Sequence, residues 1–229
     1  MESRFVRYVL YALGEILLVV IGILIALYIN ERQQWREDRQ QEQFYLQALQ
    51  QDLEQNLLEL DRVIEKSGGV LRACDSIFDY SKRIPHRIPG DSLLKYMGKI
   101  SGYTKHMTQQ GTIQDLMGSG NLAVILNDSI RRAVATWEAD MKLTRELEED
   151  AKNSRLSYNQ YLDSHIPWYE RPDVETIVKE QLPQMLFLNR VADRFSNTDY
   201  LYNTYLEIQP RWQGLLELVN KEIRENRQE

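Results

Sequence analysis

The stretch that decides the fold is residues 8–29, which read YVLYALGEILLVVIGILIALYI. As an α-helix this segment rises about 33 Å, and the hydrocarbon core of a bilayer is about 30 Å thick. A buried core helix of this length would normally carry polar residues on one face, whereas this segment carries one charge, Glu15. A cleaved signal peptide has a shorter apolar region, of about 7–15 residues, that ends at small residues. We therefore predict an uncleaved transmembrane signal anchor.

Glu15 lies about two turns inside the apolar segment, where a carboxylate costs a few kcal/mol and usually faces protein or water. Gly22 follows it at a spacing of seven, and Gly22 and Ala26 form a small-xxx-small pair that lets two helices approach closely. Together with Leu18 and Ile25, these residues predict a helix–helix contact with a second copy or another membrane protein. The alternative is a protonated or snorkelling Glu15 on a lone helix.

Working outward, residues 30–43 are almost wholly polar and contain no Pro or Gly, so the membrane helix can continue as a stalk. An apolar stripe with helical spacing then begins and is formed by Leu46, Leu49, Leu53, Leu57, Leu60 and Ile64. We expect Ser67, Gly68 and Gly69 to end this helix, because glycine is the usual residue after a helix C-terminus.

The rest of the chain shows further helical periods. Asn127, Asp128 and Ser129 form a strong helix start, a separate helical piece covers residues 186–195, and Asn197 opens a last helix. The predicted class is all-α: one N-terminal transmembrane helix continues into a stalk and an α-helical bundle of about four long helices with short connectors. The predicted organisation is a basic head over 1–7, the transmembrane helix over 8–29, the stalk and first bundle helix over 30–66, and the remaining bundle over 67–229.

Composition and spacing argue against several functional classes. The net charge is −6 and no basic stripe appears, which disfavours nucleic-acid binding. His86, His106 and His165 are scattered and show neither Glu-x-x-His pairs nor zinc-type spacing, so we predict no metal, no cofactor and no enzymatic activity. Cys74 is the sole cysteine and is expected to be a small buried hydrophobe. The acidic run 148–150 is interpreted as a solvated helix face.

Aromatic side chains gather toward the C-terminal part of the chain, which contains many of the 13 tyrosines. Aromatic rings with polar handles suit a ligand pocket or a partner surface, and they equally suit core packing with hydroxyls at the rim. The candidates for such a pocket or surface are Trp137, Tyr158, Tyr161, Trp168, Tyr202, Tyr205 and Trp212.

Two stretches carry a resemblance to a known family. The first is residues 11–27, with a Glu between a Gly and an aliphatic run; the second comprises Thr112, Leu116, residues 119–122, Ile125 and residues 130–131. Together they resemble a family of bacterial single-span membrane proteins that carries only a domain-of-unknown-function label. Members usually place a Trp within a few residues of the Ile-Asn that ends the span, whereas Trp35 comes later here. The resemblance implies a bacterial membrane and a helical domain, and it supplies no reaction or ligand.

From these observations we expect a non-enzymatic, membrane-anchored accessory or scaffold subunit of a bacterial membrane complex that assembles through its span and stalk. Its partners would be the lipid bilayer and either a second copy or another membrane protein. Arginines flank the span on both sides, but a short basic head usually stays in the cytoplasm, so we expect a bacterial inner membrane location with an extracytoplasmic C-terminal domain. The alternative is an extracytoplasmic sensor whose bundle binds a ligand and signals through a partner.

Overall fold

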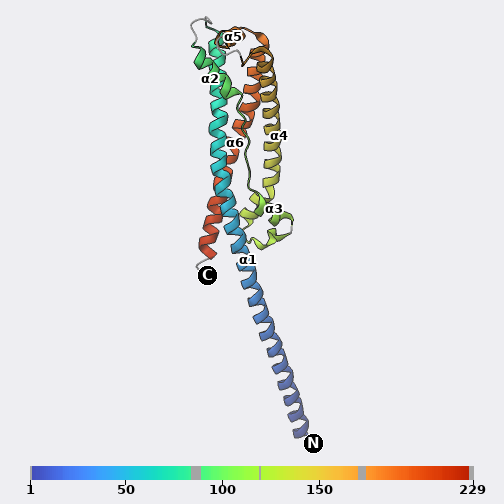
Figure 1. Ribbon diagram of the computed structural model, residues 1–229. Coiled ribbons are helices and arrows are strands. Elements are labelled where there is room, and N and C mark those ends of the chain that lie inside the picture. The colour runs from blue at the N-terminus through green and yellow to red at the C-terminus, as the bar shows by residue number, and fades with distance from the viewer. Residues whose placement is uncertain (1, 84–88, 119, 170–173, 227–229) are drawn as a thin grey trace.

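The computed structural model describes residues 2–83, 89–118, 120–169 and 174–226, with side chains from residue 13 onward. Within these ranges the regular elements are all helices, namely α1 (Glu2–Ser81), α2 (Gly90–Ile100), α3 (Gly111–Gly118), η2 (Asn121–Val124), α4 (Asp128–His165), α5 (Val174–Gln181) and α6 (Met185–Asn226). Figure 1 shows α1, α4 and α6 side by side in a long bundle, from which the N-terminal part of α1 protrudes alone. The prediction of an all-α chain whose first helix continues into a bundle is confirmed.

Helix α1 has 80 residues, so it is about 120 Å long. It continues through Ser67, Gly68 and Gly69, so the expected helix end at these residues is wrong. The reason lies in packing: a Cβ added at Gly68 would lie 3.4 Å from the ring of Tyr202 on α6 and 3.2 Å from the Arg72 guanidinium. Gly68 therefore serves the close approach of α6 to α1, rather than the termination of α1.

Helix α6 also runs farther than the sequence pattern indicated. The piece over 186–195 and the helix expected to open at Asn197 form one helix, because Arg194 and Thr198 face the core and continue the inward stripe. The Asn197 amide donates to the Asp193 carbonyl 2.9 Å away, one turn earlier in the same helix, and does not cap a new one. The described bundle consequently has three long helices, where about four were expected.

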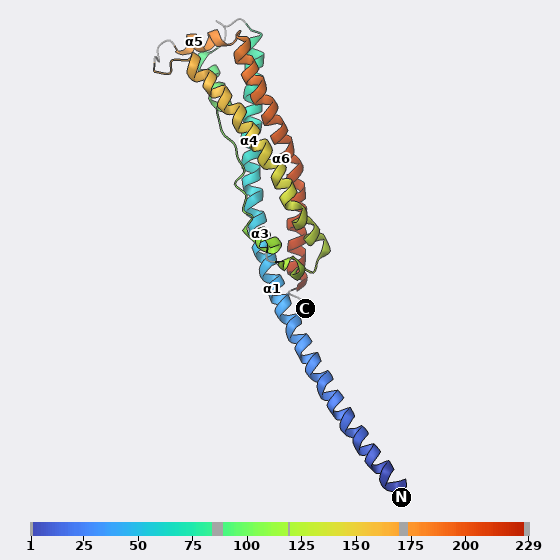
Figure 2. The same cartoon turned by 90° about the vertical axis from the view of Figure 1, so that its right-hand side faces the viewer.

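An extended segment occupies the place that a fourth helix would have. Residues 102–110, which we call the strap, lead from α2 to α3. Helix α2 lies at the distal end of the bundle, away from the protruding part of α1, and α3 lies near the proximal end (Figures 1 and 2). The strap therefore runs along the bundle between α1 and α4, and its backbone groups need partners other than helical hydrogen bonds.

The bundle interior holds two apolar cores that follow one another along its length. The proximal core is built around Leu49, Val134 and Trp212, and the distal core around Ile77, Tyr158 and Phe187. Between the two cores lies a layer of buried polar side chains, formed by Ser67, Ser154, Arg194 and Thr198.

Candidate functional site

Arg194 is the largest polar side chain in this layer and is 2% exposed. Its Nε donates to the Ile100 carbonyl at 3.2 Å and its Nη2 donates to the Gly102 carbonyl at 2.9 Å. Its Nη1 donates to the Ala151 carbonyl at 3.1 Å and to the Thr198 hydroxyl at 2.7 Å. Burial lowers the pKa of the Arg194 guanidinium to about 10, which still leaves it charged at neutral pH. The side chain thereby joins α2, the strap and α4 to α6.

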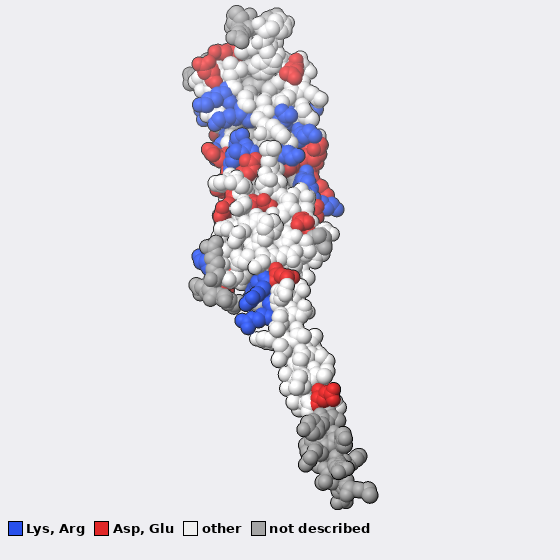
Figure 3. All heavy atoms as spheres, turned by 60° about the horizontal axis from the view of Figure 1, so that its bottom comes forward, with Lys and Arg blue, Asp and Glu red and all other residues white. Residues whose placement is uncertain are grey.

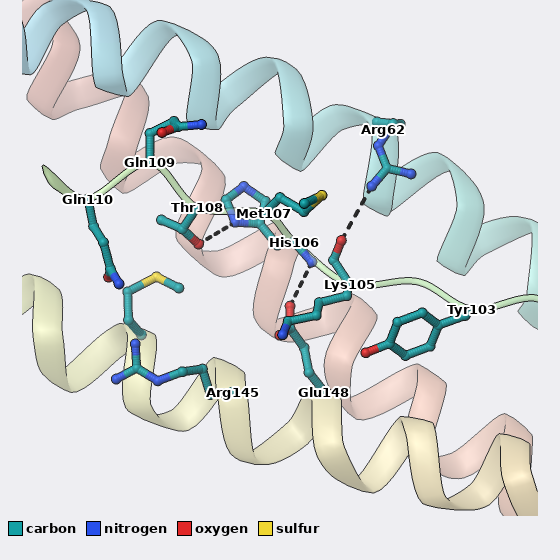
Figure 4. A pocket seen from close by; sticks show the side chains of 11 residues that line it. Arg62, Tyr103, Lys105, His106, Met107, Thr108, Gln109, Gln110, Arg145 and Glu148 are labelled. Atoms are coloured by element: carbon teal, nitrogen blue, oxygen red, sulfur yellow. Dashed lines mark hydrogen bonds between the residues drawn. The ribbon is translucent and has the colours of Figure 1, made fainter.

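Glu148 is a second buried polar centre, on α4 and 5% exposed. Its Oε1 accepts the backbone N–H of His106 at 2.8 Å (Figure 4) and the hydroxyl of Tyr205 at 2.7 Å. The interpretation of residues 148–150 as a solvated face holds for Glu149 and Asp150, which are exposed, and is wrong for Glu148. Glu148 lies in the inward register of α4, where the strap and α6 supply its donors.

His106, on the strap, is packed next to this carboxylate. Its Nε2 lies 3.0 Å from the Asn56 carbonyl, and its Nδ1 lies 2.7 Å from the Thr108 hydroxyl. Because a carbonyl only accepts, these partners assign the proton to Nε2 and make Nδ1 an acceptor for the Thr108 hydroxyl. Burial lowers the pKa of His106, so the ring is neutral at pH 7. The centroid of the His106 ring lies 5.3 Å from the centroid of the Trp212 ring.

Asn56 on α1 fastens the other end of the strap. Its Nδ2 donates to the Gln109 carbonyl at 2.6 Å, and its Oδ1 accepts the Gln109 N–H at the same distance. The Asn56 side chain is fully buried, so it replaces both hydrogen bonds that the Gln109 backbone would otherwise make with water. The strap is thus held by side chains from all three long helices: Asn56 on α1, Glu148 on α4 and Arg194 on α6. Arg62 on α1 also donates to the Lys105 carbonyl at 3.3 Å (Figure 4).

A further buried carboxylate stands where α1 leaves the bundle. Glu42 is fully buried and forms an ion pair with Arg39 at 2.6 Å. It also accepts the Leu126 N–H at 2.7 Å and the Asn226 amide at 3.2 Å. Arg39 donates to the Asn226 side chain at 3.1 Å. This group, which we call the Glu42 clamp, fastens α1 to the end of α6 and to the loop before α4.

The strap borders an open groove with a volume of about 620 Å³, in which Arg62, His106, Arg145 and Glu148 take part (Figure 4). An adjoining groove of about 430 Å³ continues toward the distal end and shares Arg62 and Tyr103 with the first. Within the part of the chain that the structure describes, no three His, Cys, Asp or Glu side chains lie where they would hold a metal ion. The residues that line the two grooves supply charged and hydrogen-bonding side chains, among them Arg62, Lys105 and Glu148.

The aromatic candidates are divided between several places. Trp137 and Trp212 stack at 4.4 Å in the proximal core, and Tyr205 is buried beside them. Tyr158 and Tyr161 are part of the distal core. Trp168 is 43% exposed beyond the end of α4, and Tyr202 lies against Gly68. The structure brings the first three together with His106 and places the other four elsewhere.

The candidates for the helix–helix contact lie on the protruding part of α1. Glu15, Leu18, Gly22, Ile25 and Ala26 are all exposed, and a Cβ added at Gly22 would meet no atom within 4 Å. The helix is long and apolar enough to cross a membrane, and none of its most apolar window is buried in the fold. In Figure 3 the described apolar stretch of this helix is almost free of charged side chains, in contrast to the bundle; residues 13–29 contain one, Glu15. The predicted contact face is therefore free for a partner, and the contact itself stays a prediction.

Sequence reasoning missed Glu42, Asn56, Glu148 and Arg194 as a group. Each one occupies an inward position on a helix, within a stripe of apolar neighbours. A polar residue at a core position is the signal that would have found them, because such residues are buried only with hydrogen-bond partners. The local sequence pattern does not indicate which residues those partners are.

Comparison with curated proteins and with solved structures finds no match. Comparison with family models finds one, DUF6090, described as a family of unknown function, over residues 15–161. The matched range begins at Glu15 and includes Arg39 and Glu42 of the Glu42 clamp, Asn56, the strap and Glu148. Asn226, the partner of the clamp on α6, lies outside it. The match ends before Arg194, which lies on α6 outside the matched range. With more than half of its length matched, the chain belongs to DUF6090, a family of unknown function.

Proposed function

We propose that this protein is a membrane-anchored, non-enzymatic helical module, serving as an accessory or scaffold subunit of a bacterial membrane complex. The observation that carries the proposal is the continuity of α1, which runs without a break from the exposed apolar segment to Ser81. A continuous helix of this kind would hold the bundle at a fixed distance from the membrane surface. From Ile29 to Glu42 the rise is about 20 Å.

The Glu42 clamp supports a rigid connection between the proposed span and the bundle. A buried carboxylate with donors from three directions resists rotation of α1 against α6, because any such rotation would leave the charge without partners. Movement or tilting of the span in its membrane would therefore be passed on to the bundle, which suits a subunit that spaces or orients its partners.

The assembly itself would use the face that carries Glu15, Gly22 and Ala26. Small residues allow backbones to approach closely in lipid, and a carboxylate inside the apolar segment is best placed against protein. We propose that this face meets a second copy or another single-span protein, with the N-terminus in the cytoplasm and the bundle outside the inner membrane.

Native mass measurement of the full chain in mild detergent, with identification of co-purifying chains, tests this proposal. We expect a complex larger than the monomer for the wild type, and its loss in Glu15→Leu and Gly22→Leu while membrane insertion is kept. Leu24→Ile is the matched control, because Leu24 lies on the opposite side of the helix from Glu15. A monomeric wild-type protein that purifies without partner chains would contradict the proposed scaffold function.

An extracytoplasmic ligand sensor is the second candidate. The two adjoining grooves beside the strap favour it, since both are bordered by the segment that joins α2 to α3. Ligand-dependent change in the mass of the complex would distinguish a sensor from a scaffold, whose assembly needs no ligand.

A further inference from the structure

The two grooves beside the strap are strongly basic. Six cationic side chains line them, contributed by α1, the end of α2, the strap and α4: Arg62, Lys66, Arg72, Lys99, Lys105 and Arg145. The acidic side chains that line them are two, Glu65 and Glu148. Glu148 is buried and already accepts two hydrogen bonds inside the fold. A basic surface of this kind stands out in a chain whose net charge is −6.

Most of these cations have no acidic partner. Arg62 pairs with Glu59, and Arg145 pairs with Glu138 at 2.5 Å. Among the residues that the structure describes, the other four groove cations form no ion pair with a carboxylate. Like charges held together without counter-charges repel one another, and an anion relieves that repulsion.

A further cation stands beside the grooves. The Arg155 guanidinium lies over the ring of Tyr103, 5.2 Å from its centroid, and Tyr103 lines both grooves. The Nε of Arg155 is buried and has no acceptor. A buried donor without a partner is uncommon in folded proteins and is satisfied when an acceptor arrives.

The spacing of the cations indicates the size of the ligand. From Arg62 to Arg72 the rise along α1 is about 15 Å, which is longer than one phosphate group. From Ile29 to Arg62 the rise is about 50 Å, so an upright bundle holds the grooves well beyond the lipid headgroups of its own membrane. This placement favours a solute with several anionic groups over a lipid of that membrane.

We propose that the joined grooves bind a small soluble molecule that carries two or more phosphate groups. Arginine and lysine are the side chains that proteins use for phosphate, arginine through paired N–H donors and lysine as a point charge. This site goes beyond the proposed scaffold function and does not depend on assembly, because all of its residues belong to one chain.

The test is calorimetric titration of the full chain in zwitterionic micelles with inorganic tripolyphosphate as the probe. We expect saturable binding of one tripolyphosphate per chain. The double variant Lys66→Gln, Arg72→Gln should weaken it by about tenfold or more, since two charge-assisted contacts are lost. The control Lys221→Gln, Arg224→Gln removes two exposed cations from the proximal end of α6 and should bind like the wild type.

Three results would overturn the site. The first is no binding of tripolyphosphate by the wild type. The second is equal loss of binding in the groove variant and the control variant. This result would show that tripolyphosphate is attracted by the overall charge of the protein rather than by the grooves. The third is orthophosphate binding as tightly as tripolyphosphate, which would remove the requirement for several phosphate groups. Lys66 and Arg72 are exposed, so the groove variant should unfold at the wild-type temperature, and circular dichroism checks this.

Discussion

The two parts of α1 differ in burial: residues 13–29 bury no side chain, whereas the part in the bundle buries both apolar and polar side chains. Over residues 13–29 every side chain is exposed, although Glu15 is the sole charge there. Farther along the same helix, Glu42 and Asn56 are fully buried, while Phe44 and Leu58 are 68% and 64% exposed. In the bundle, hydrogen-bond partners decide which polar groups are inside. In the protruding part no protein partner is present in the fold, and an apolar surface of that length calls for lipid or another chain.

The largest expected effect comes from Arg194→Ala. This change removes the guanidinium that donates to the carbonyls of Ile100, Gly102 and Ala151 between the two cores. The Ala151 carbonyl keeps the Ser154 hydroxyl as a donor. We expect the free energy of unfolding to fall by about 3–5 kcal/mol, measured by denaturant titration of the full chain in detergent. Arg224→Ala removes an exposed arginine of the same helix and should cost less than about 0.5 kcal/mol. Equal losses in the two variants would contradict the role of the buried polar layer.

Two adjacent glutamates on α4 allow a buried carboxylate to be compared with an exposed one. Glu148→Ala should lower the free energy of unfolding by about 2–4 kcal/mol, because the His106 N–H and the Tyr205 hydroxyl lose their acceptor. Glu149→Ala, which removes an exposed partner of Lys152, should change it by less than about 0.5 kcal/mol. The same denaturant titration compares the two. Equally small losses in the two variants would mean that Glu148 behaves like a solvated residue and that its contact with the strap contributes little to stability.

A smaller effect is expected from pH through His106. Its pKa is lowered by burial in the folded protein, and the ring in the unfolded chain titrates near pH 6.5. The unfolded state therefore binds more protons below about pH 6.5, and stability falls with decreasing pH by at most about 1.4 kcal/mol per pH unit. Glu148, Glu59 and Arg62 are the charged groups that act on this ring.

Thermal unfolding between pH 7.5 and about 5.5 measures this slope, above the range where carboxylates dominate. His106→Gln should flatten it, because the depressed pKa of the buried ring is the source of the slope. A slope that persists in His106→Gln would assign the pH dependence to other groups.

Local patterns predicted the features that depend on neighbours in the sequence. Asn127 caps α4 as expected, since its side chain accepts the N–H groups of Ser129 and Ile130. Cys74 is buried as predicted, and burial raises the pKa of its thiol to about 12. The leucine stripe of α1 was also predictable, because helical spacing alone places it on one face.

Features that join distant segments were outside the reach of such patterns. Asn56 and Gln109 are bonded across 53 positions, and Arg194 reaches Ile100 across 94. Gly68 was predicted to lie at a helix end. A pair of glycines has the same sequence pattern at a helix terminus and at a position where an aromatic ring packs against the helix backbone. The strap was unpredictable for the same reason, since its backbone partners are side chains from three other elements.

The central claim is that residues 13–29 lie in a bilayer while the helix continues into water and into the bundle. Single cysteines at Ile23 and at Gln34, each in a Cys74→Ala background, test it with a membrane-impermeant maleimide on intact cells that express the protein. We predict rapid labelling at Gln34 and none at Ile23 until detergent dissolves the membrane. Labelling at Ile23 as fast as at Gln34 would contradict the claim, because the apolar segment would then lie in water.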